Sequence, residues 1–216
     1  MNILIMGDSH NQSKFIRKTL EKEKDSFDYL IHTGDLAGHR LNHLTNSKGL
    51  DESIELLIKN NAKIVRGNHD LCTLQRYPHL ISSDAKTFLS DLPNHIILEE
   101  FPYILFQHSQ PSGIQALPTK NKFEREINEM KKYYEEFEII FHGHSHVSSI
   151  TSGKKDSNEF RYIVSPKTDK TILLSKDYKH VVDVGIIFNF TPGRLFNPPR
   201  YVILDTNKRE IVYKRA

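Results

Sequence analysis

Short apolar runs recur along the first half of the chain, and polar residues with Gly or His follow each run within a few positions. The runs at residues 3–6, 29–32, 63–65 and 103–106 have the length of buried strands. Helical spacing of apolar residues separates them, with Asp51 expected as the N-cap of the second helix. The helical patterns comprise Phe15, Ile16 and Leu20, then Ile54, Leu57 and Ile58, then Phe123, Ile127, Met130 and Tyr134. This alternation predicts an α/β fold with a parallel portion, whose ligand sites lie at the carboxyl ends of strands.

The pattern changes after residue 147, where short strand-like runs follow one another without helical spacing. They lie at residues 147–150, 161–164, 171–174, 180–184, 201–204 and 210–213, separated by Gly, Pro, Asp and Asn. We expect this part to be antiparallel, with polar turns at residues 153–158 and 165–170. Because no repeat, heptad run or flexible linker divides the chain, we expect one domain over residues 1–216.

Composition narrows the class of protein. The 216 residues are 38% apolar and 26% charged, which suits a globular domain with a substantial core. Cys72 is the single cysteine, so no internal disulfide can form and the cytoplasm is the expected compartment. No apolar run approaches the ~20 residues of a membrane span, and the start shows no targeting pattern, so no membrane association is expected. The net charge of +3 comes mostly from scattered residues, which argues against binding of long nucleic acids.

The twelve histidines are the unusual feature, and several of them lie in five polar clusters that follow predicted strands. The clusters are Gly7-Asp8-Ser9-His10, Gly34-Asp35, Gly67-Asn68-His69-Asp70, His108 and Gly143-His144-Ser145-His146. Successive clusters are spaced by about one strand–helix–strand unit of ~30 or more residues. Successive strands can therefore deliver all five clusters to one edge of a sheet.

Together the clusters offer carboxylates, an amide and imidazoles, a set that suits borderline ions such as Mn²⁺, Fe or Zn²⁺. Seven ligands are too many for one ion with an open position, and they divide over two ions if one carboxylate bridges them. Residues i and i+2 of an extended segment point the same way, so Asp8 with His10, and His144 with His146, are expected to converge. Ser9 and Ser145 then point away.

Each cluster also has a structural interpretation. Gly-Asp after a strand is usually a turn, Gly67-Asn68-His69-Asp70 suits the start of a helix, and Gly143 to His146 suits a hairpin tip. A lone His108 after an apolar strand is commonly a hydrogen-bonded core residue, as we expect for His32 and His142. The metal interpretation depends on the five clusters occurring together, in this order and at this spacing.

This ordered set of motifs, spanning residues 7 to 146, resembles the calcineurin-like metallophosphoesterases. The resemblance implies a four-layer αββα sandwich of two mixed β-sheets flanked by helices. It also implies that Asp8, His10 and His146 hold one ion, that Asn68, His108 and His144 hold the other, and that Asp35 bridges them. His69 would stay off the metals and protonate the leaving oxygen, with Asp70 orienting it. Asp183-Val184-Gly185 and Pro199-Arg200-Tyr201 resemble the ending of the family's small bacterial phosphodiesterases.

The function expected from these features is hydrolysis of a small phosphodiester or phosphomonoester, a nucleotide being one candidate, by in-line attack of a hydroxide shared by two ions. Mn²⁺ is the favoured ion, with Fe, Zn²⁺ and Ni²⁺ as alternatives. Family members acting as protein phosphatases or dinucleoside tetraphosphate hydrolases carry Gly-Asp-x-x-Asp-Arg-Gly, whereas this chain has Gly38 and His39 there. His39 and Arg40 are candidates to line a substrate cleft, and Arg66 is expected in a salt bridge or in solvent. A non-catalytic protein-binding scaffold and a nuclease are the alternatives, and the oligomeric state is open.

Overall fold

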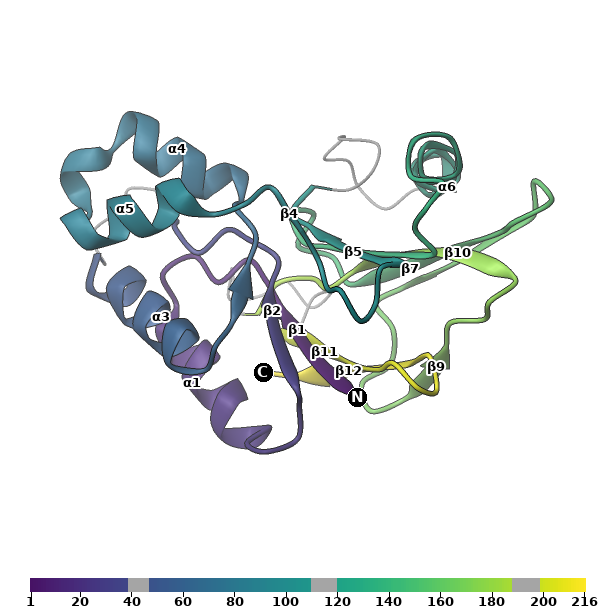
Figure 1. Cartoon of the computed structure of the whole chain (residues 1–216), viewed down its shortest axis with the longest axis horizontal. Helices are drawn as coiled ribbons and strands as arrows, with labels where there is room; N and C mark the ends of the chain where they lie inside the picture. The colour runs from purple at the N-terminus through teal and green to yellow at the C-terminus, as the bar shows by residue number, and fades with distance from the viewer. Residues whose placement is uncertain (39–46, 110–119, 188–198) are drawn as a thin grey trace.

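The computed structural model describes residues 1–38, 47–109, 120–187 and 199–216. Its strands form two six-stranded sheets that face each other (Figure 1). Among the described residues, no helix has the length and apolar character needed to cross a membrane.

The first sheet carries the N-terminal strands and has the order β3-β2-β1-β11-β12-β9. Strand β1 is parallel to β2 and antiparallel to β11, so the sheet is mixed. Its strands are β1 (Asn2–Met6), β2 (Tyr29–His32), β3 (Lys63–Ile64), β9 (Thr171–Leu173), β11 (Arg200–Asp205) and β12 (Glu210–Arg215).

The second sheet has the order β4-β5-β6-β10-β7-β8 and is also mixed. Strand β6 is parallel to both β5 and β10, whereas β10 is antiparallel to β7. Its strands are β4 (His95–Ile97), β5 (Ile104–Gln107), β6 (Ile139–His142), β7 (Ser149–Lys154), β8 (Phe160–Val164) and β10 (Tyr178–Asp183). The parallel β6–β10 pair is the exception to the antiparallel arrangement expected after residue 147.

The helices cover the outer faces of the two sheets (Figure 1). Alternation along the strands explains the layers, since Ile3 and Ile5 pack between the sheets while Leu4 and Met6 pack under helices of the first sheet. A third apolar cluster joins the outer face of the second sheet to α6. The helices are α1 (Ser13–Lys22), α3 (Ser47–Lys59), α4 (Asn68–Arg76), α5 (Ser83–Asp91) and α6 (Lys120–Tyr133), with a 3₁₀ turn η1 (Pro78–Leu80). The predicted four-layer α/β sandwich is therefore confirmed.

Two local expectations need correction. Asp51 is not an N-cap, because α3 already includes Ser47, and the Asp51 carboxylate instead accepts a hydrogen bond from Ser82 Oγ. The sequence pattern also indicated only a possible helix start at residues 67–70, whereas a full helix spans Asn68–Arg76. Only Asp70 and Thr73 of α4 are buried, so this helix has no apolar stripe for a periodicity search to detect.

Candidate metal centre

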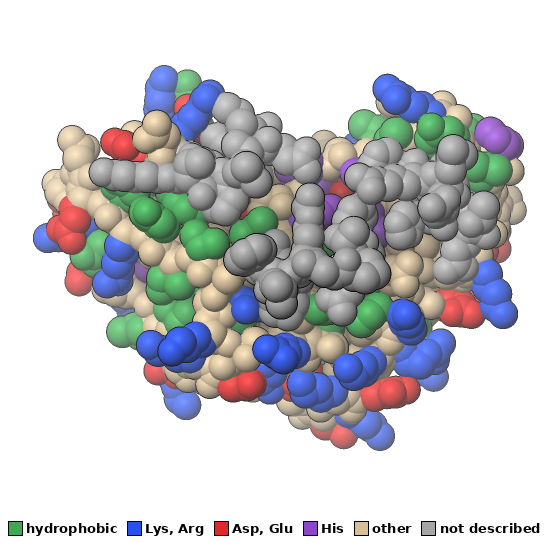
Figure 2. Space-filling model, turned by 180° about the vertical axis from the view of Figure 1, so that it is seen from behind, with side chains coloured by type: hydrophobic (Ala, Val, Ile, Leu, Met, Phe, Trp, Pro, Cys, Tyr) green, Lys and Arg blue, Asp and Glu red, His purple; other side chains and the backbone are tan. Residues whose placement is uncertain are grey.

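The carboxyl ends of β1, β2, β5 and β6 and the start of α4 meet at one end of the sandwich. This arrangement brings together side chains from all five polar clusters of the sequence. Figure 2 shows histidine side chains gathered near the centre of one face of the molecule. Two groups of side chains are close enough to hold a cation: Asp8, His10, Asp35 and His146, and Asp35, His108 and His144.

The first group converges on Asp8, which is fully buried. Asp8 Oδ1 lies 3.3 Å from His146 Nε2 and 4.0 Å from His10 Nε2. The two imidazole Nε2 atoms are themselves 3.2 Å apart. Three potential ligand atoms thus point at one small volume.

The second group is built around His108. Its Nε2 lies 3.4 Å from Asp35 Oδ2 and 2.8 Å from Asn68 Oδ1. His144 Nδ1 lies 2.7 Å from the same Asn68 oxygen and 3.3 Å from His108 Nε2. Asn68, the first residue of α4, therefore joins this group through its amide oxygen.

Asp35 belongs to both groups, and its two oxygens differ in environment. Asp35 Oδ1 accepts a hydrogen bond from the His69 main-chain N–H at 2.8 Å, whereas the buried Oδ2 has no hydrogen-bond partner within the described part of the chain. Oδ2 is also 3.9 Å from His10 Nε2. A buried carboxylate oxygen without a hydrogen bond is costly unless a cation compensates it. The donor set of carboxylate, amide and imidazole therefore fits divalent transition metals.

Main-chain carbonyls orient two of the imidazoles for this purpose. His10 Nδ1 lies 3.1 Å from the Ala37 carbonyl oxygen, and His108 Nδ1 lies 2.8 Å from that of Thr33. Because a carbonyl can only accept, each Nδ1 donates to it, and each Nε2 is directed into the cluster. This is the usual outer-sphere arrangement of a metal-binding histidine.

Asp8 and His10 lie in one ligand group, as alternate residues were expected to, whereas His144 and His146 belong to different groups. The extended geometry assumed for both pairs was also wrong. Asp8, His10, His144 and His146 have φ values of 52°, 44°, 71° and 61°, so they are left-handed rather than extended. Such residues carry backbone strain, which commonly accumulates at functional sites. Gly143 makes this packing possible, since a Cβ there would lie 2.4 Å from Asp8 Oδ2.

In the cluster, the carboxylates and the imidazoles shift each other's pKa values. Burial alone would lower the pKa of His108, but the Asp35 and Asp8 carboxylates raise it to about 9. Burial would raise the pKa of Asp35, but the surrounding histidines, His108 first, lower it well below its usual value. The carboxylates therefore stay ionised and attract positive charge to this end of the sandwich.

His69 and Asp70 occupy different positions relative to the cluster. His69 Nε2 lies 3.9 Å from Asp35 Oδ2, and its ring is tilted against that of His10 at 4.7 Å. Asp70 is fully buried and accepts main-chain N–H bonds from Asp35, Ala37 and Gly67 at 2.8–3.0 Å. Asp70 thus ties the Asp35 turn to the start of α4, and its expected role in orienting His69 stays a prediction.

Asp183 is a supporting residue to which the sequence analysis gave no role at the site. Ser145 points away from the cluster, as expected, and donates a short hydrogen bond to Asp183 Oδ2. Asp183 Oδ1 accepts from the Gly185 N–H at 2.9 Å, so this carboxylate anchors the turn that carries His144 and His146. The sequence offered one signal for Asp183. Like Asp8 and Asp35, it lies at the end of an apolar run, and a Gly follows it shortly afterwards.

The remaining candidates lie outside the cluster or outside the described residues. His32 and His142 are buried in strands, as expected, and burial lowers the pKa of His32 to about 4. Arg66 donates to Asn94 Oδ1 at 2.8 Å, and it forms no salt bridge with the residues that the structure describes. His39 and Arg40 lie outside the described residues.

Comparison with known proteins agrees with this architecture. A metallophosphoesterase from Sphaerobacter thermophilus aligns with a TM-score of 0.73 and 18% identity, over 100% of this chain and 88% of that one. The hypothetical protein PH1004 from Pyrococcus horikoshii OT3 aligns with a TM-score of 0.66 and 13% identity, over 100% and 87%. At these identities the likeness shows a shared fold. No curated protein matched the chain.

The sequence itself matches the family model of the calcineurin-like phosphoesterase superfamily domain over residues 1–165. The matched segment includes all five polar clusters and both side-chain groups around Asp35. The chain therefore belongs to the calcineurin-like phosphoesterase superfamily, a family of metal-dependent phosphoric ester hydrolases.

Proposed function

We propose that this chain hydrolyses a small phosphodiester or phosphomonoester at the cluster around Asp35. The observation that carries the proposal is the sharing of Asp35 by two groups of ligand atoms, with its buried Oδ2 free of hydrogen bonds among the described residues. A carboxylate in this position suits a bridge between two cations.

The residues divide into two ligand sets. Asp8, His10 and His146 would hold one ion, Asn68, His108 and His144 the other, and Asp35 both. Two divalent ions supply positive charge for the phosphoryl oxygens and increase the acidity of water. Mn²⁺ is the favoured ion because the set mixes oxygen and imidazole ligands without a thiolate.

His69 is placed to move a proton. Its main-chain N–H holds Asp35 Oδ1, while its side chain is 17% exposed and reaches the edge of the cluster. We assign to His69 the donation of a proton to the leaving oxygen, because that oxygen departs as a poor leaving group unless it is protonated. Phosphate esters therefore lie between the ligand groups and His69 during the reaction.

The substrate is expected to be small. The chain's charge is nearly balanced, and it carries Gly38 and His39 where phosphatases acting on proteins or dinucleoside tetraphosphates carry Asp and Arg. A long nucleic acid would require a basic surface tracking its backbone. Mono- and dinucleotides and simple phosphodiesters are the classes to test first. The single cysteine favours the cytoplasm as the compartment.

The test is a substrate panel of generic mono- and diesters and natural nucleotides. It should be assayed with metal-stripped protein refilled with Mn²⁺, Zn²⁺, Fe²⁺ or Ni²⁺. Turnover that depends on added metal, greatest with Mn²⁺, is the expected result. Metal binding without turnover of any ester would favour the scaffold alternative instead.

A further inference from the structure

The four edges of the two sheets are not alike. Three of them end in strands of two or three residues, β3, β4 and β9, whereas β8 has five. Short strands blunt a sheet edge, because they leave few main-chain groups free to pair with another chain. Strand β8 lacks this protection, and among the described strands it pairs only with β7.

Strand β8 is also apolar and exposed. Of the nine exposed large apolar side chains in the described part of the chain, three are consecutive in this strand. Tyr162, Ile163 and Val164 are 44%, 43% and 38% exposed. A long apolar edge with free main-chain groups is unfavourable in water unless another strand pairs with it.

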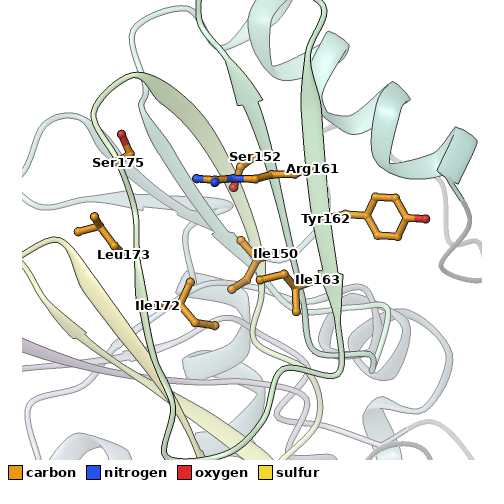
Figure 3. Close-up of a pocket in the computed structure, with 8 residues that line it drawn as sticks. All are labelled: Ile150, Ser152, Arg161, Tyr162, Ile163, Ile172, Leu173 and Ser175. Carbon is orange, nitrogen blue, oxygen red and sulfur yellow. The ribbon is translucent and has the colours of Figure 1, made fainter.

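The two faces of β8 differ in their surroundings (Figure 3). Tyr162 points toward α6, where its ring stacks on Phe123 at 4.6 Å. Arg161 and Ile163 point the other way and line a cavity of ≈ 280 Å³ that also includes Ile172 of β9. Side chains on both faces of β8 thus have contacts within the chain, whereas its main-chain edge has no partner strand among the described strands.

We propose that β8 of a second copy of this chain pairs with β8 across a two-fold axis. The second sheet of one copy and that of the other then form one continuous sheet. Antiparallel pairing centred on Tyr162 places Phe160 opposite Val164 of the second copy, and Tyr162 opposite itself. Arg161 then faces Ile163, so no like charges meet. Beyond the strand ends, antiparallel pairing also brings Glu159 of one copy toward the end that carries Lys167 of the other. A self-complementary patch of this kind is what a two-fold dimer requires.

Matched substitutions at Ile163 test the register. Ile163→Lys places a cation opposite Arg161 of the second copy, whereas Ile163→Glu places an anion there at a similar cost of burial. By sedimentation, we expect a concentration-dependent dimer for the wild type and for Ile163→Glu. The two-fold axis makes the contact between positions 163 and 161 occur twice in the dimer. Ile163→Lys should therefore weaken dimerisation by about tenfold or more, and adding Arg161→Glu should restore it.

Cross-linking gives an independent readout. In a Cys72→Ser background, Tyr162→Cys places two cysteines opposite each other on the axis and should form an intermolecular disulfide. Val164→Cys is the control on the same face, since the register separates its two copies by about 13 Å along the strand, beyond disulfide reach. Metal content and circular dichroism verify that each variant is folded.

Three results would overturn the proposal. One is a single-chain mass for the wild type at every concentration tested. Another is an equal effect of Ile163→Lys and Ile163→Glu, and the third is cross-linking of Val164→Cys as readily as of Tyr162→Cys. Since the Ile163 comparison does not use the Tyr162→Cys variant, a folding failure of that variant leaves the test decisive.

Discussion

His108 in the cluster and His180 in the second sheet are both buried, yet their pKa values are shifted in opposite directions. His108 lies beside the Asp35 carboxylate, and its pKa is raised to about 9. His180 Nε2 donates to the Ser175 carbonyl at 2.9 Å and its Nδ1 accepts from Ser152 Oγ at 2.8 Å, so its hydrogen-bond partners are uncharged. Burial, together with Arg209 and Arg161, lowers the pKa of His180 to about 4. The charge of the neighbours, rather than burial, therefore decides whether a buried imidazole is held protonated or neutral.

The largest effect is expected from removing the charge at the centre of the cluster. Asp35→Asn keeps the size of the side chain but loses the anion shared by both ligand groups. We expect kcat/KM to fall by about 10³-fold or more, beyond the loss from any single histidine ligand. Steady-state kinetics of Asp35→Asn and His146→Ala, both with Mn²⁺ in excess, would show the order. A smaller loss for Asp35→Asn would contradict a bridging role.

His69→Ala should separate proton transfer from metal binding. We expect turnover to fall by about 10²- to 10⁴-fold while metal content stays close to that of the wild type. The loss should grow with the basicity of the leaving group, because a nitrophenolate departs without a proton. Measuring kcat/KM over aryl and alkyl esters gives this dependence. Equal losses across the series would assign His69 to substrate binding instead.

Metal should also stabilise the fold, because ions that bind only the folded chain favour it. A hundredfold excess over the dissociation constant adds about 2.7 kcal/mol to the free energy of unfolding. Thermal melts of stripped and Mn²⁺-loaded protein check this effect. A melting temperature that is the same with and without Mn²⁺ would contradict a cluster organised for cations. As a control, His180→Gln, which is remote from the ligand groups, should show the same Mn²⁺-dependent shift as the wild type.

His180 should instead contribute a pH dependence. Its folded-state pKa of about 4 lies below the unfolded value, so stability is full above about pH 6.5 and falls as the pH drops toward 4. Between pH 7 and pH 5 this histidine alone accounts for about 2 kcal/mol. Urea unfolding of wild type and His180→Gln at both pH values isolates the contribution. Parallel losses in the two proteins would show that His180 is not held neutral.

The smallest predicted effect concerns the turn that carries two ligands. Ser145→Ala removes the hydrogen bond to Asp183 and frees a strained turn. We expect the affinity for Mn²⁺ to fall by about tenfold, as for other outer-sphere partners of metal ligands. Calorimetric titration measures it, with Ser9→Ala as the control, since Ser9 Oγ has no hydrogen-bond partner in the described structure. Equal affinities of the two variants would remove this role from Ser145.

Much of the fold and of the site could be predicted from the sequence, because two signals coincide at the strand ends: an apolar run, and the polar residues that follow it. An apolar run ending in Gly with Asp, Asn or His identified the positions of Asp8, Asp35 and His144. The length of helix α4 was missed because only Asp70 and Thr73 of it are buried, so no apolar stripe marks it. The left-handed turns were also missed, although Asp, Asn and His are the non-glycine residues most often found with positive φ. Asp183 escaped because its contact with Ser145 joins residues that are distant in sequence.

The central claim is that Asp35 joins two metal sites, and a metal titration of the stripped protein tests it most directly. Calorimetry and elemental analysis would count the Mn²⁺ ions bound per chain while turnover is followed in the same samples. We predict two ions per wild-type chain, with turnover completed by the second, and weakened binding of both ions in Asp35→Asn. Full activity with one ion, or two tightly bound ions and near-normal turnover in Asp35→Asn, would contradict it.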